Sequence, residues 1–270
     1  MTIENSTITL TFSECVENHA RNQQLGEIVK PGEGFSINDI LLINKTVTEQ
    51  GYVSEIYNLK DSLISTNPEL SDVVDDANII VIRNGVNLLL EGDDMIDKLF
   101  NEHKVLNHDK KVKMYGRVVN KLARHNLCFT DTAQEPNYDN GEGRIIAFGD
   151  QQIKLTTSIR DNLNKLLDSP KMSKLFAEGN YYYDKSICGI GFHGDGERRK
   201  VVGIRLGASM VLKYQWYTQS KPITGSKPLE LNLNHGDIYV MSEKAAGTDW
   251  KFSSKYTLRH SAGCPKFTKL

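Results

Sequence analysis

The sequence lacks three features that are typical of membrane-spanning or secreted proteins. It contains no run of 18 apolar residues, so we expect no membrane-spanning helix. Its first residues lack the basic start and apolar stretch of a secretory signal, so we expect a protein that is not secreted. The four cysteines are far apart and form no Cys-x-x-Cys pair, which is typical of reduced thiols. These absences favour the cytoplasm, the nucleus or, for a viral protein, the host cell.

A large excess of charge of one sign is also missing. Lysine and arginine number 33 against 34 aspartate and glutamate, which gives a net charge of −1. This balance excludes a strongly basic nucleic-acid scaffold but allows a local basic patch. Hydrophobic residues make up 39% and charged residues 25% of the 270 residues, a composition that is typical of one large or two small globular domains.

The clearest functional signal is His193-Gly194-Asp195, with His260 much further along the chain. Two imidazoles and one carboxylate on one face of a metal leave the opposite positions open, as in non-haem Fe(II) oxygenases. His193 and Asp195 are two residues apart, so on a strand both side chains would leave the same face. Taken alone, the motif also fits a surface histidine beside a surface aspartate in a glycine-rich turn, so its surroundings must decide.

The surroundings follow a defined order. Around the motif stand Asn180-Tyr181-Tyr182-Tyr183, Gly189-Ile190-Gly191-Phe192, Glu197, a strand-like segment at 200–207 and Gly236-Asp237-Ile238-Tyr239-Val240-Met241. This order resembles the AlkB family of Fe(II)/2-oxoglutarate dioxygenases. Members of that family run Asn-x-Tyr, Ile-Gly-x-His-x-Asp-x-Glu, a Ser-Leu-Gly strand, a Gly-Asp strand ending in Val-Met, and a distal histidine. The resemblance covers about residues 78–270 and is most specific in its central part.

The resemblance implies an α+β fold whose core is a double-stranded β-helix, a cupin-like jelly roll, with flanking helices. It divides the chain into an N-terminal extension of unknown role, residues 1–77, and a dioxygenase domain, residues 78–270. Within that domain it implies a lid-like segment at 114–143 and a jelly-roll core at 179–270. Short strands separated by Gly and Pro from residue 179 onward also suit this core.

The resemblance also implies the cofactors and their ligands. Fe(II) would be bound by His193, Asp195 and His260, with 2-oxoglutarate and O₂ at the open positions. Asn180 and Tyr182 match the Asn-x-Tyr of the family, whose tyrosine reaches a 2-oxoglutarate carboxylate. The reaction would hydroxylate a C–H bond, foremost in a methyl group on a nucleic-acid base, and would release succinate and CO₂. Ascorbate would support turnover in vitro. His235 matches a histidine that is structural in the family.

The C-terminus departs from the family pattern. AlkB enzymes use an arginine beyond the distal histidine to pair with the distal carboxylate of 2-oxoglutarate, and no arginine follows His260. A buried carboxylate still requires a paired charge. Lys269 and Lys266 are the candidates, because related prolyl hydroxylases place a cation near the register of Lys269. Arg205 and Lys213, on predicted strands, are reserves.

Substrate contacts are expected from the lid-like segment and from the residues just after the metal motif. Arg117, Arg124, Tyr138 and Glu197 are the candidate substrate-binding residues. A cluster of positive charge accompanies the first two and suits phosphate contacts, although a solvated basic edge would look the same: Lys110, Lys111, Lys113, Arg117, Lys121, Arg124 and His125.

Elsewhere the sequence gives only local signals. Apolar and β-branched runs predict strands at 35–43, 51–57 and 78–83, with 86–90 continuing the third. Helical spacing of apolar residues predicts helices at 93–103 and 158–176.

Three functions remain open at this point. The preferred hypothesis is an AlkB-like dioxygenase that acts on a methylated base in DNA or RNA. A protein hydroxylase of the prolyl type is favoured by the register of Lys269. The third is a degenerate jelly-roll protein, of a virion or a scaffold, that has no enzymatic activity. Nucleic acid is the expected partner and a membrane is not, and the oligomeric state is left open.

Overall fold

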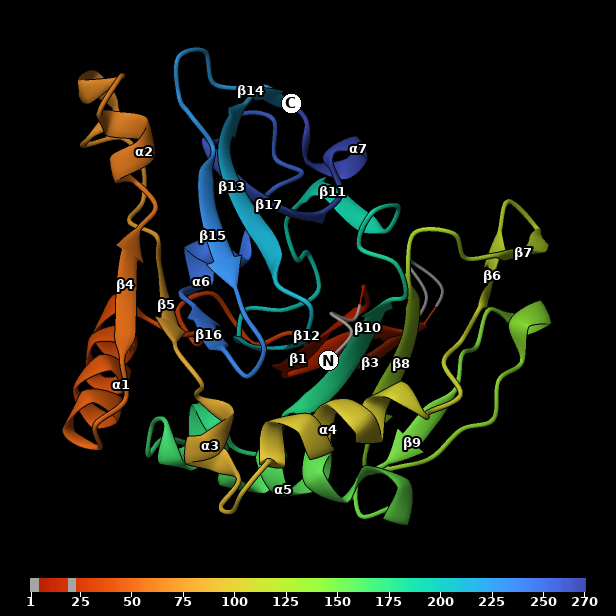
Figure 1. The fold of residues 1–270 in the computed structure, drawn as a ribbon. Coiled ribbons are helices and arrows are strands. Elements are labelled where there is room, and N and C mark those ends of the chain that lie inside the picture. The colour runs from red at the N-terminus through yellow and green to blue at the C-terminus, as the bar shows by residue number, and fades with distance from the viewer. Residues whose placement is uncertain (1–4, 19–22) are drawn as a thin grey trace.

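The computed structural model describes residues 5–18 and 23–270, and its framework is two antiparallel sheets that face each other (Figure 1). The larger sheet has eight strands, and all neighbours are antiparallel except the last pair, which is parallel. In spatial order these strands are β4 (Ser54–Asn58), β5 (Asn78–Ile82), β16 (Ile238–Met241), β12 (Val201–Gly207), β1 (Thr7–Ser13), β10 (Phe176–Tyr182), β8 (His125–Thr130) and β9 (Ile145–Ala147).

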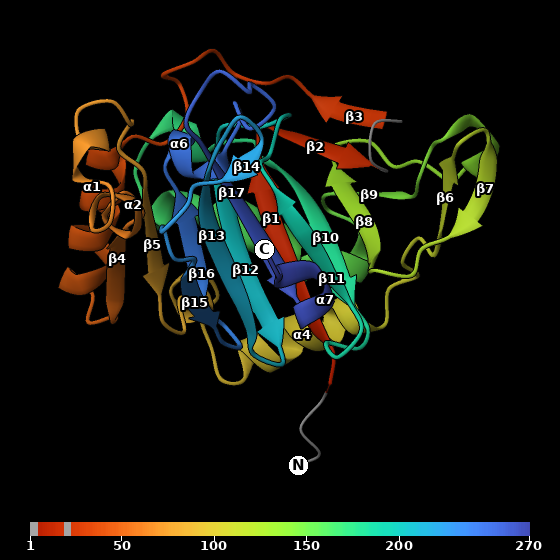
Figure 2. The same ribbon diagram turned by 90° about the horizontal axis from the view of Figure 1, so that it is seen from above.

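The smaller sheet has five strands. They are β11 (Gly189–His193), β17 (Thr257–Gly263), β13 (Met210–Thr218), β14 (Lys221–Pro222) and β15 (Leu229–Leu233), of which the last two both pair with β13. Two separate hairpins are β2 (Cys15–Asn18) with β3 (Gln23–Gly26), and β6 (Lys111–Met114) with β7 (Arg117–Asn120). The β6–β7 hairpin extends away from the body of the protein in both views (Figures 1 and 2).

Helices α1 (Ile37–Glu49), α3 (Val86–Leu89), α4 (Met95–Lys104) and α5 (Lys154–Asn162) cover the face of the large sheet that lies away from the small sheet (Figure 1). The other α-helices are α2 (Asp61–Ile64), α6 (Glu243–Ala246) and α7 (Pro265–Thr268). Short 3-10 helices are η1 (Pro68–Leu70), η2 (Tyr138–Asn140), η3 (Gln151–Ile153), η4 (Leu163–Lys165) and η5 (Pro170–Met172). Among the described residues, none of the helices has the length and apolar character needed to cross a membrane.

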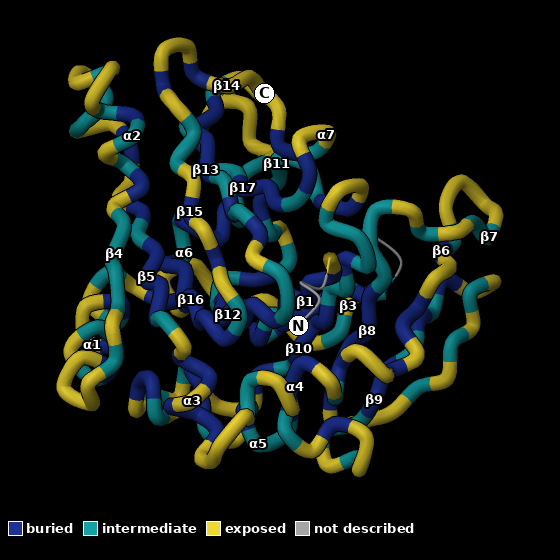
Figure 3. The backbone as a smooth tube through the Cα atoms, in the orientation of Figure 1, coloured by how far each residue is buried: buried dark blue, intermediate teal, exposed yellow. Residues whose placement is uncertain are grey.

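Alternation along the strands produces two separate cores, because successive side chains of a strand leave opposite faces of the sheet. In β12, Val202 and Ile204 belong to the core against the helices, while Val201 belongs to the core between the sheets. In β16, Val240 belongs to the core against the helices and Tyr239 to the core between the sheets. Figure 3 shows the resulting buried interior, with exposure concentrated at loops, helix surfaces and the β6–β7 hairpin.

The N-terminal strand β1 lies in the middle of the large sheet, between β10 and β12 (Figure 2). Its sequence, Thr-Ile-Thr-Leu-Thr-Phe-Ser, alternates polar and apolar residues, the pattern of a strand with two different faces. Ile8, Leu10 and Phe12 are fully buried against the helices, so Thr9 and Thr11 face the small sheet. The segment before residue 78, to which the sequence assigned no role, thus contributes two strands to the large sheet, β1 in its middle and β4 at its edge.

The broad fold class expected from the sequence is confirmed: the protein is α+β and is built on antiparallel sheets. Helix α4 and strands β4 and β5 lie where they were predicted. The helix predicted at 158–176 is confirmed only at its start, because α5 ends at Asn162, 3-10 turns follow, and β10 begins at Phe176.

Two predicted strands are wrong, because residues 37–49 and 86–89 are helical. In the first case Ser36 and Asp39 form a reciprocal capping box, and Ile40, Ile43 and Val47 form one buried helix face. These local helix signals override the β propensity of the isoleucines and leucines.

Two buried histidines near α4 are held in the neutral form. His103 Nε2 lies 2.6 Å from Thr156 Oγ1, whose hydroxyl donates to Glu102, and His108 Nδ1 lies 3.0 Å from the carbonyl of Leu106. Burial lowers the pKa of His103 to about 3 and that of His108 to about 4. The unfolded chain takes up these protons near pH 6.5 and the folded chain does not, so stability is lost as the pH falls below that value.

We therefore predict that the free energy of unfolding falls between about pH 6 and pH 4, by about 1.4 kcal/mol per pH unit for each of these histidines. Urea denaturation across this range measures the slope. His103→Gln retains an amide donor toward Thr156 and removes one titrating group, so its slope should be shallower by about 1.4 kcal/mol per pH unit. An unchanged slope in this variant would show that His103 does not stay neutral in the folded protein.

Candidate metal centre

The pairing of β11 with β17 brings two histidines from distant parts of the chain side by side. His193 ends β11 and lies directly opposite His260 of β17 in the antiparallel register, after a bulge between Ile190 and His193. Residues opposite each other in such a pair have side chains close enough to share a ligand. The two imidazole rings are 4.6 Å apart between centroids and are inclined edge to face.

Asp195 completes the group from a loop rather than from the strand. The prediction that His193 and Asp195 share one strand is wrong, because β11 ends at His193. The loop is fixed by the backbone N–H of Asp195, which donates to the carbonyl of Ala246 in α6 (2.8 Å). Gly194 packs so closely on the neighbouring chain that a Cβ there would collide with the carbonyl oxygen of Gly247. The loop that carries Asp195 therefore requires glycine at position 194.

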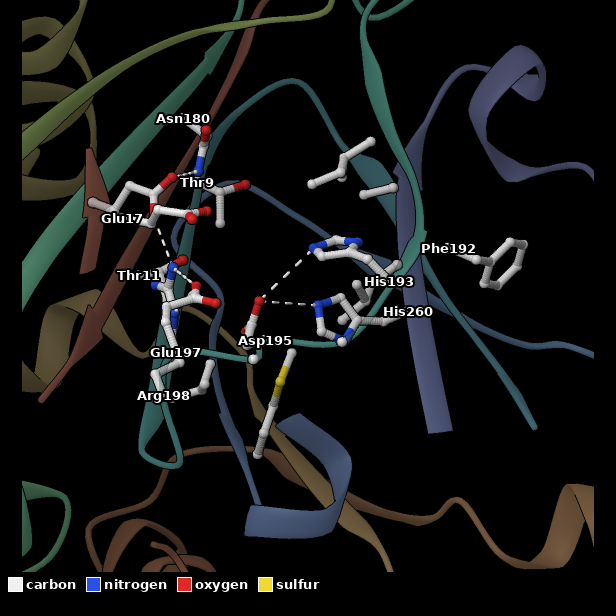
Figure 4. Close-up of a pocket in the computed structure, with 18 of the residues that line it drawn as sticks. Thr9, Thr11, Glu17, Asn180, Phe192, His193, Asp195, Glu197, Arg198 and His260 are labelled. Atoms are coloured by element: carbon white, nitrogen blue, oxygen red, sulfur yellow. Dashed lines mark hydrogen bonds and ion pairs between the residues drawn. The ribbon is translucent and has the colours of Figure 1, made fainter. Parts of the chain in front are cut away.

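The three side chains converge on one point (Figure 4). The Nε2 atoms of His193 and His260 each lie 3.8 Å from Asp195 Oδ1, and the ligand atoms of all three residues lie within 4.8 Å of one another. His193 Nδ1 lies 2.8 Å from the carbonyl oxygen of Gly191, so this nitrogen carries the proton and Nε2 is left with a lone pair. This group could hold a metal ion.

Burial favours the metal-binding form of His260. The residue is 6% exposed, and burial lowers its pKa well below the ordinary value, helped by the nearby His193 and Arg198. A neutral imidazole is the form that coordinates metals.

The three residues lie in a cavity of about 460 Å³ between the two sheets. Apolar side chains from both sheets form part of its wall, namely Ile190, Val201, Leu212, Met241 and Ala262. Much of the remaining lining is polar or charged. We call the part formed by β1 and its neighbours the floor, and the part that carries carboxylates the charged wall.

The floor is built on a row of residues that face one another across three strands. Asn180 of β10 is opposite Thr9 of β1, which is opposite Arg205 of β12. Arg205 is 1% exposed and donates from one terminal nitrogen to Thr9 Oγ1 (2.7 Å), while its Nε has no hydrogen-bond partner. Among the described residues, no carboxylate forms an ion pair with Arg205. Asp237, which lies near it, is paired with Arg83 (2.7 Å) instead.

This arrangement leaves a buried cation without a counter-charge. Burial lowers the pKa of the Arg205 guanidinium, yet an arginine side chain stays charged in proteins. A buried charge without a partner is costly, so the floor of the cavity is suited to an anion. The buried tyrosines Tyr182 and Tyr239 also line this part of the cavity.

The charged wall is, by contrast, internally paired. Arg124 Nε donates to Asn180 Oδ1 (2.7 Å), Asn180 Nδ2 donates to Glu178 Oε1 (2.9 Å), and Arg198 donates to both Glu178 (2.8 Å) and Glu197 (2.8 Å). Both bonds from Arg198 to Glu197 reach Oε1, so Glu197 Oε2 retains capacity to accept a hydrogen bond from a molecule in the cavity.

Most of the cofactor and metal residues named from the sequence meet in this cavity, and some others do not. Of the residues named from the sequence, those that line the cavity are His193, Asp195, His260, Asn180, Tyr182, Arg205, Arg124 and Glu197.

The lysines proposed as anchors lie elsewhere. Lys266 in α7 and Lys269 directly after it are exposed and outside the cavity lining, and Lys213 forms an ion pair with Glu230 (2.7 Å).

Two of the predicted substrate contacts also lie outside the cavity. Arg117 is exposed on the β6–β7 hairpin, and the hydroxyl of Tyr138 donates to Asp109 (2.7 Å). His235 is engaged away from the centre, by Gly207 N–H (2.9 Å) and Asp97 (3.0 Å).

Sequence reasoning missed the contribution of the N-terminal strand and of the paired wall. Thr9, Thr11, Glu178 and Tyr239 all line the cavity and were not predicted as site residues. The alternation of threonine with large apolar residues in 7–12 was a usable signal for a strand with a polar face. Nothing local indicated that this face would meet residues about 190 positions away.

Comparison with known proteins gives one close relative and no functional label. The chain is 46% identical over 269 residues, covering 100% of both proteins, to a protein of Acanthamoeba polyphaga mimivirus named "Uncharacterized protein R156", and it belongs to the same family. No protein-family model matches the chain.

Gly194 and Gly196 flank Asp195 and provide a matched pair of variants. An added Cβ at 194 would collide with the backbone of Gly247, whereas at 196 it would make ordinary contacts with Trp250 (3.5 Å) and Lys251 (3.8 Å). We predict that Gly194→Ala displaces Asp195 and weakens Fe(II) or Co(II) binding about tenfold or more, the effect expected when a metal ligand is no longer supported. Calorimetric titration should show little change for Gly196→Ala, and equal affinities in the two variants would contradict this role for Gly194.

Proposed function

We propose that the protein is an Fe(II)- and 2-oxoglutarate-dependent dioxygenase that hydroxylates a C–H bond, most specifically in a methyl group on a nucleic-acid base. The observation that carries this proposal is the combination, in one cavity, of a two-histidine, one-carboxylate group with a buried arginine that has no counter-charge. A ligand that has one carboxylate for a metal and a second for a cation would satisfy both features, and 2-oxoglutarate is such a molecule.

We further propose that the two sheets form a double-stranded β-helix. From residue 176 onward, β10, β12 and β16 join the large sheet, while β11, β13, β15 and β17 join the small one. Strand β1, between β10 and β12, would be the fourth strand of the large-sheet half. This gives the eight strands, in two sheets, of a jelly roll. In this proposal the N-terminal segment is part of the catalytic fold.

The donor set fits Fe(II). Two imidazole nitrogens and one carboxylate oxygen suit a divalent first-row metal, and a group of three protein ligands leaves positions open for a co-substrate and O₂. When bound, iron with 2-oxoglutarate and O₂ supplies the oxidising power to hydroxylate an unactivated C–H bond, with succinate and CO₂ as co-products.

The side chains of the protein have separate tasks in this proposal. His193, Asp195 and His260 hold the metal, and Arg205, which is steadied by Thr9, pairs with the distal carboxylate of 2-oxoglutarate. The apolar wall on both sheets limits the access of water, which strengthens the electrostatic contacts within the cavity. Arg205 thereby takes the role that the sequence had suggested for Lys269.

The substrate assignment is supported by charge around the cavity. Arg124 lines the cavity, and the exposed β6–β7 hairpin, which is close to it in sequence, carries further cations that include Lys111 and Arg117. Phosphate groups of a nucleic acid would pair with such cations. Glu197 Oε2 is available to accept a hydrogen bond from a donor group of the base. A base within a duplex would have to be flipped or single-stranded to enter the cavity.

Peptide hydroxylation is the second candidate, but the feature that favoured it is weakened. That candidate relied on Lys269 as the anchor, and the exposed Lys269 is not part of the cavity lining. It is therefore kept as an outcome of the experiment, together with the degenerate protein that has no turnover.

The first test is succinate formation by the purified protein with Fe(II), ascorbate and 2-oxoglutarate. Methylated single-stranded DNA, methylated RNA and a mixed peptide pool are compared as substrates. We expect stimulation by a methylated nucleic acid and none by its unmethylated form, and we expect Asp195→Ala to abolish turnover because one metal ligand is removed. Stimulation by peptides alone would favour the hydroxylase, and failure to bind Fe(II) by the folded protein would exclude both enzymes.

A second test separates the two candidate anchors. Arg205→Gln should weaken 2-oxoglutarate binding to the Mn(II)-loaded protein by about 2 kcal/mol or more, roughly 30-fold, because a buried carboxylate loses its charged partner. Lys269→Gln should bind 2-oxoglutarate like the natural protein, since Lys269 is exposed. Calorimetry measures both affinities, and the Mn(II) affinity of each variant reports whether the cavity is intact. The opposite ranking of the two variants would return the anchor to Lys269.

A further inference from the structure

A second basic surface lies next to the metal cavity and was not indicated by the sequence motifs. It is formed by two segments, residues 219–229 and 250–259, which contain no Asp or Glu. Their cations, which we call the basic rim, are Lys221, Lys227, Lys251, Lys255 and Arg259. The four lysines are exposed.

The two segments are joined in the folded protein. The backbone N–H of Gln219 donates to the carbonyl of Ser253 (3.1 Å), at the end of the small sheet where β13 finishes and β17 starts. The nearest acidic residues in the sequence are already paired, since Asp249 binds Lys244 (2.8 Å) and Glu230 binds Lys213 (2.7 Å). The rim therefore gathers five cations on two joined segments that contain no acidic residue, in a protein whose net charge is −1.

Aromatic rings are interleaved with these cations. The Arg259 guanidinium lies 4.1 Å from the centre of the Tyr217 ring and 5.2 Å from that of Trp250. The Lys251 ammonium is 5.5 Å from the Trp250 ring, and that of Lys255 is 5.3 Å from the ring of Phe252, which is 59% exposed. Of these rings, Phe252 is exposed, Trp250 is half-buried and Tyr217 is buried. Proteins bind single-stranded nucleic acids with phosphates on cations and bases stacked on neighbouring exposed rings, and Phe252 beside Lys255 offers such a pair.

The basic rim is continuous with the cavity. Trp250 and Lys251 line the cavity, and Trp250 also packs against Gly194, beside the metal-binding Asp195. A strand bound along the rim would therefore pass the cavity opening. Strand β14, at one end of the rim, and the basic β6–β7 hairpin lie on different sides of the protein (Figure 1).

We propose that the basic rim is a binding track for single-stranded nucleic acid, which leads a nucleotide to the metal cavity. This inference rests on the proposed function for its substrate class and adds a surface outside the lid-like segment. An acidic peptide would pair with the lysines but would make no specific use of the exposed Phe252 ring, so the alternation of charge and ring favours nucleic acid.

The test is fluorescence anisotropy of a labelled, unmethylated single-stranded oligonucleotide with the full-length protein over a range of salt concentrations. Lys221→Glu/Lys255→Glu reverses two exposed charges that do not line the cavity. We expect at least about tenfold weaker binding and a shallower salt dependence, by about 0.7 in the log–log slope for each phosphate that is no longer neutralised. Phe252→Ala should weaken binding about tenfold with the salt slope unchanged, because a base can no longer stack on this ring.

The matched control is Lys98→Glu/Lys154→Glu, which makes the same change of charge at exposed positions of α4 and α5. Binding by this control equal to that of the rim variant would overturn the proposal, because only net charge would then matter. Absence of oligonucleotide binding by the natural protein, or binding of an acidic peptide with equal affinity, would also overturn it.

The succinate assay separates failure of the track from failure of the enzyme. If the rim variant turns over a methylated oligonucleotide as fast as the natural protein does, the proposed enzyme activity is supported and the binding track is excluded. Rim-dependent binding without turnover would support the track and not the reaction.

Discussion

The site depends above all on the antiparallel pairing of β11 with β17, because this pairing alone places His193 opposite His260. A slip of one residue would turn the other face of β17 inward and bring Arg259 or Ser261 to the place of the histidine. Close packing between the strands resists such a slip: a Cβ on Gly263 would collide with the Cα of Gly189, its partner in the ladder. The glycines thus fix the register that brings the candidate metal ligands together.

The second constraint is the position of β1. A strand from the start of the chain is hydrogen-bonded on both sides to strands from its second half, and its Thr9 supports Arg205 on the cavity floor. The floor therefore cannot form until β1 has met these strands of the second half of the chain, and a fragment that starts near residue 78 would leave β10 and β12 with unpaired edges. The motifs suggest a division of the chain at residue 78. This division does not match a boundary in the large sheet, because β1 pairs with both β10 and β12.

Charge is distributed unevenly within the cavity, and the two halves are suited to different ligands. Arg198 is shared by Glu178 and Glu197, so that wall is organised before anything binds. Arg205 has only the neutral Thr9 as a side-chain partner, so its burial costs stability that an anionic ligand would restore. The free energy gained when an anion binds would therefore come mainly from its contact with Arg205, which lines the same cavity as the candidate metal ligands.

The sequence allowed the site to be predicted where the signal is local and failed where distant segments meet. The order of residues from Asn180 to Glu197 is contiguous, so two of the three candidate metal ligands, His193 and Asp195, and much of the cavity lining could be named from it. Lys269, which was chosen by its distance from His260, lies outside the cavity lining. That choice assumed that the chain after β17 stays beside the cavity. Pro265 instead begins the short helix α7, where its fixed φ suits the first helical turn, and the following lysines are exposed. The cation that faces the cavity is supplied by β12 and held by β1, a contact across about 196 residues that no spacing rule within the motif contains.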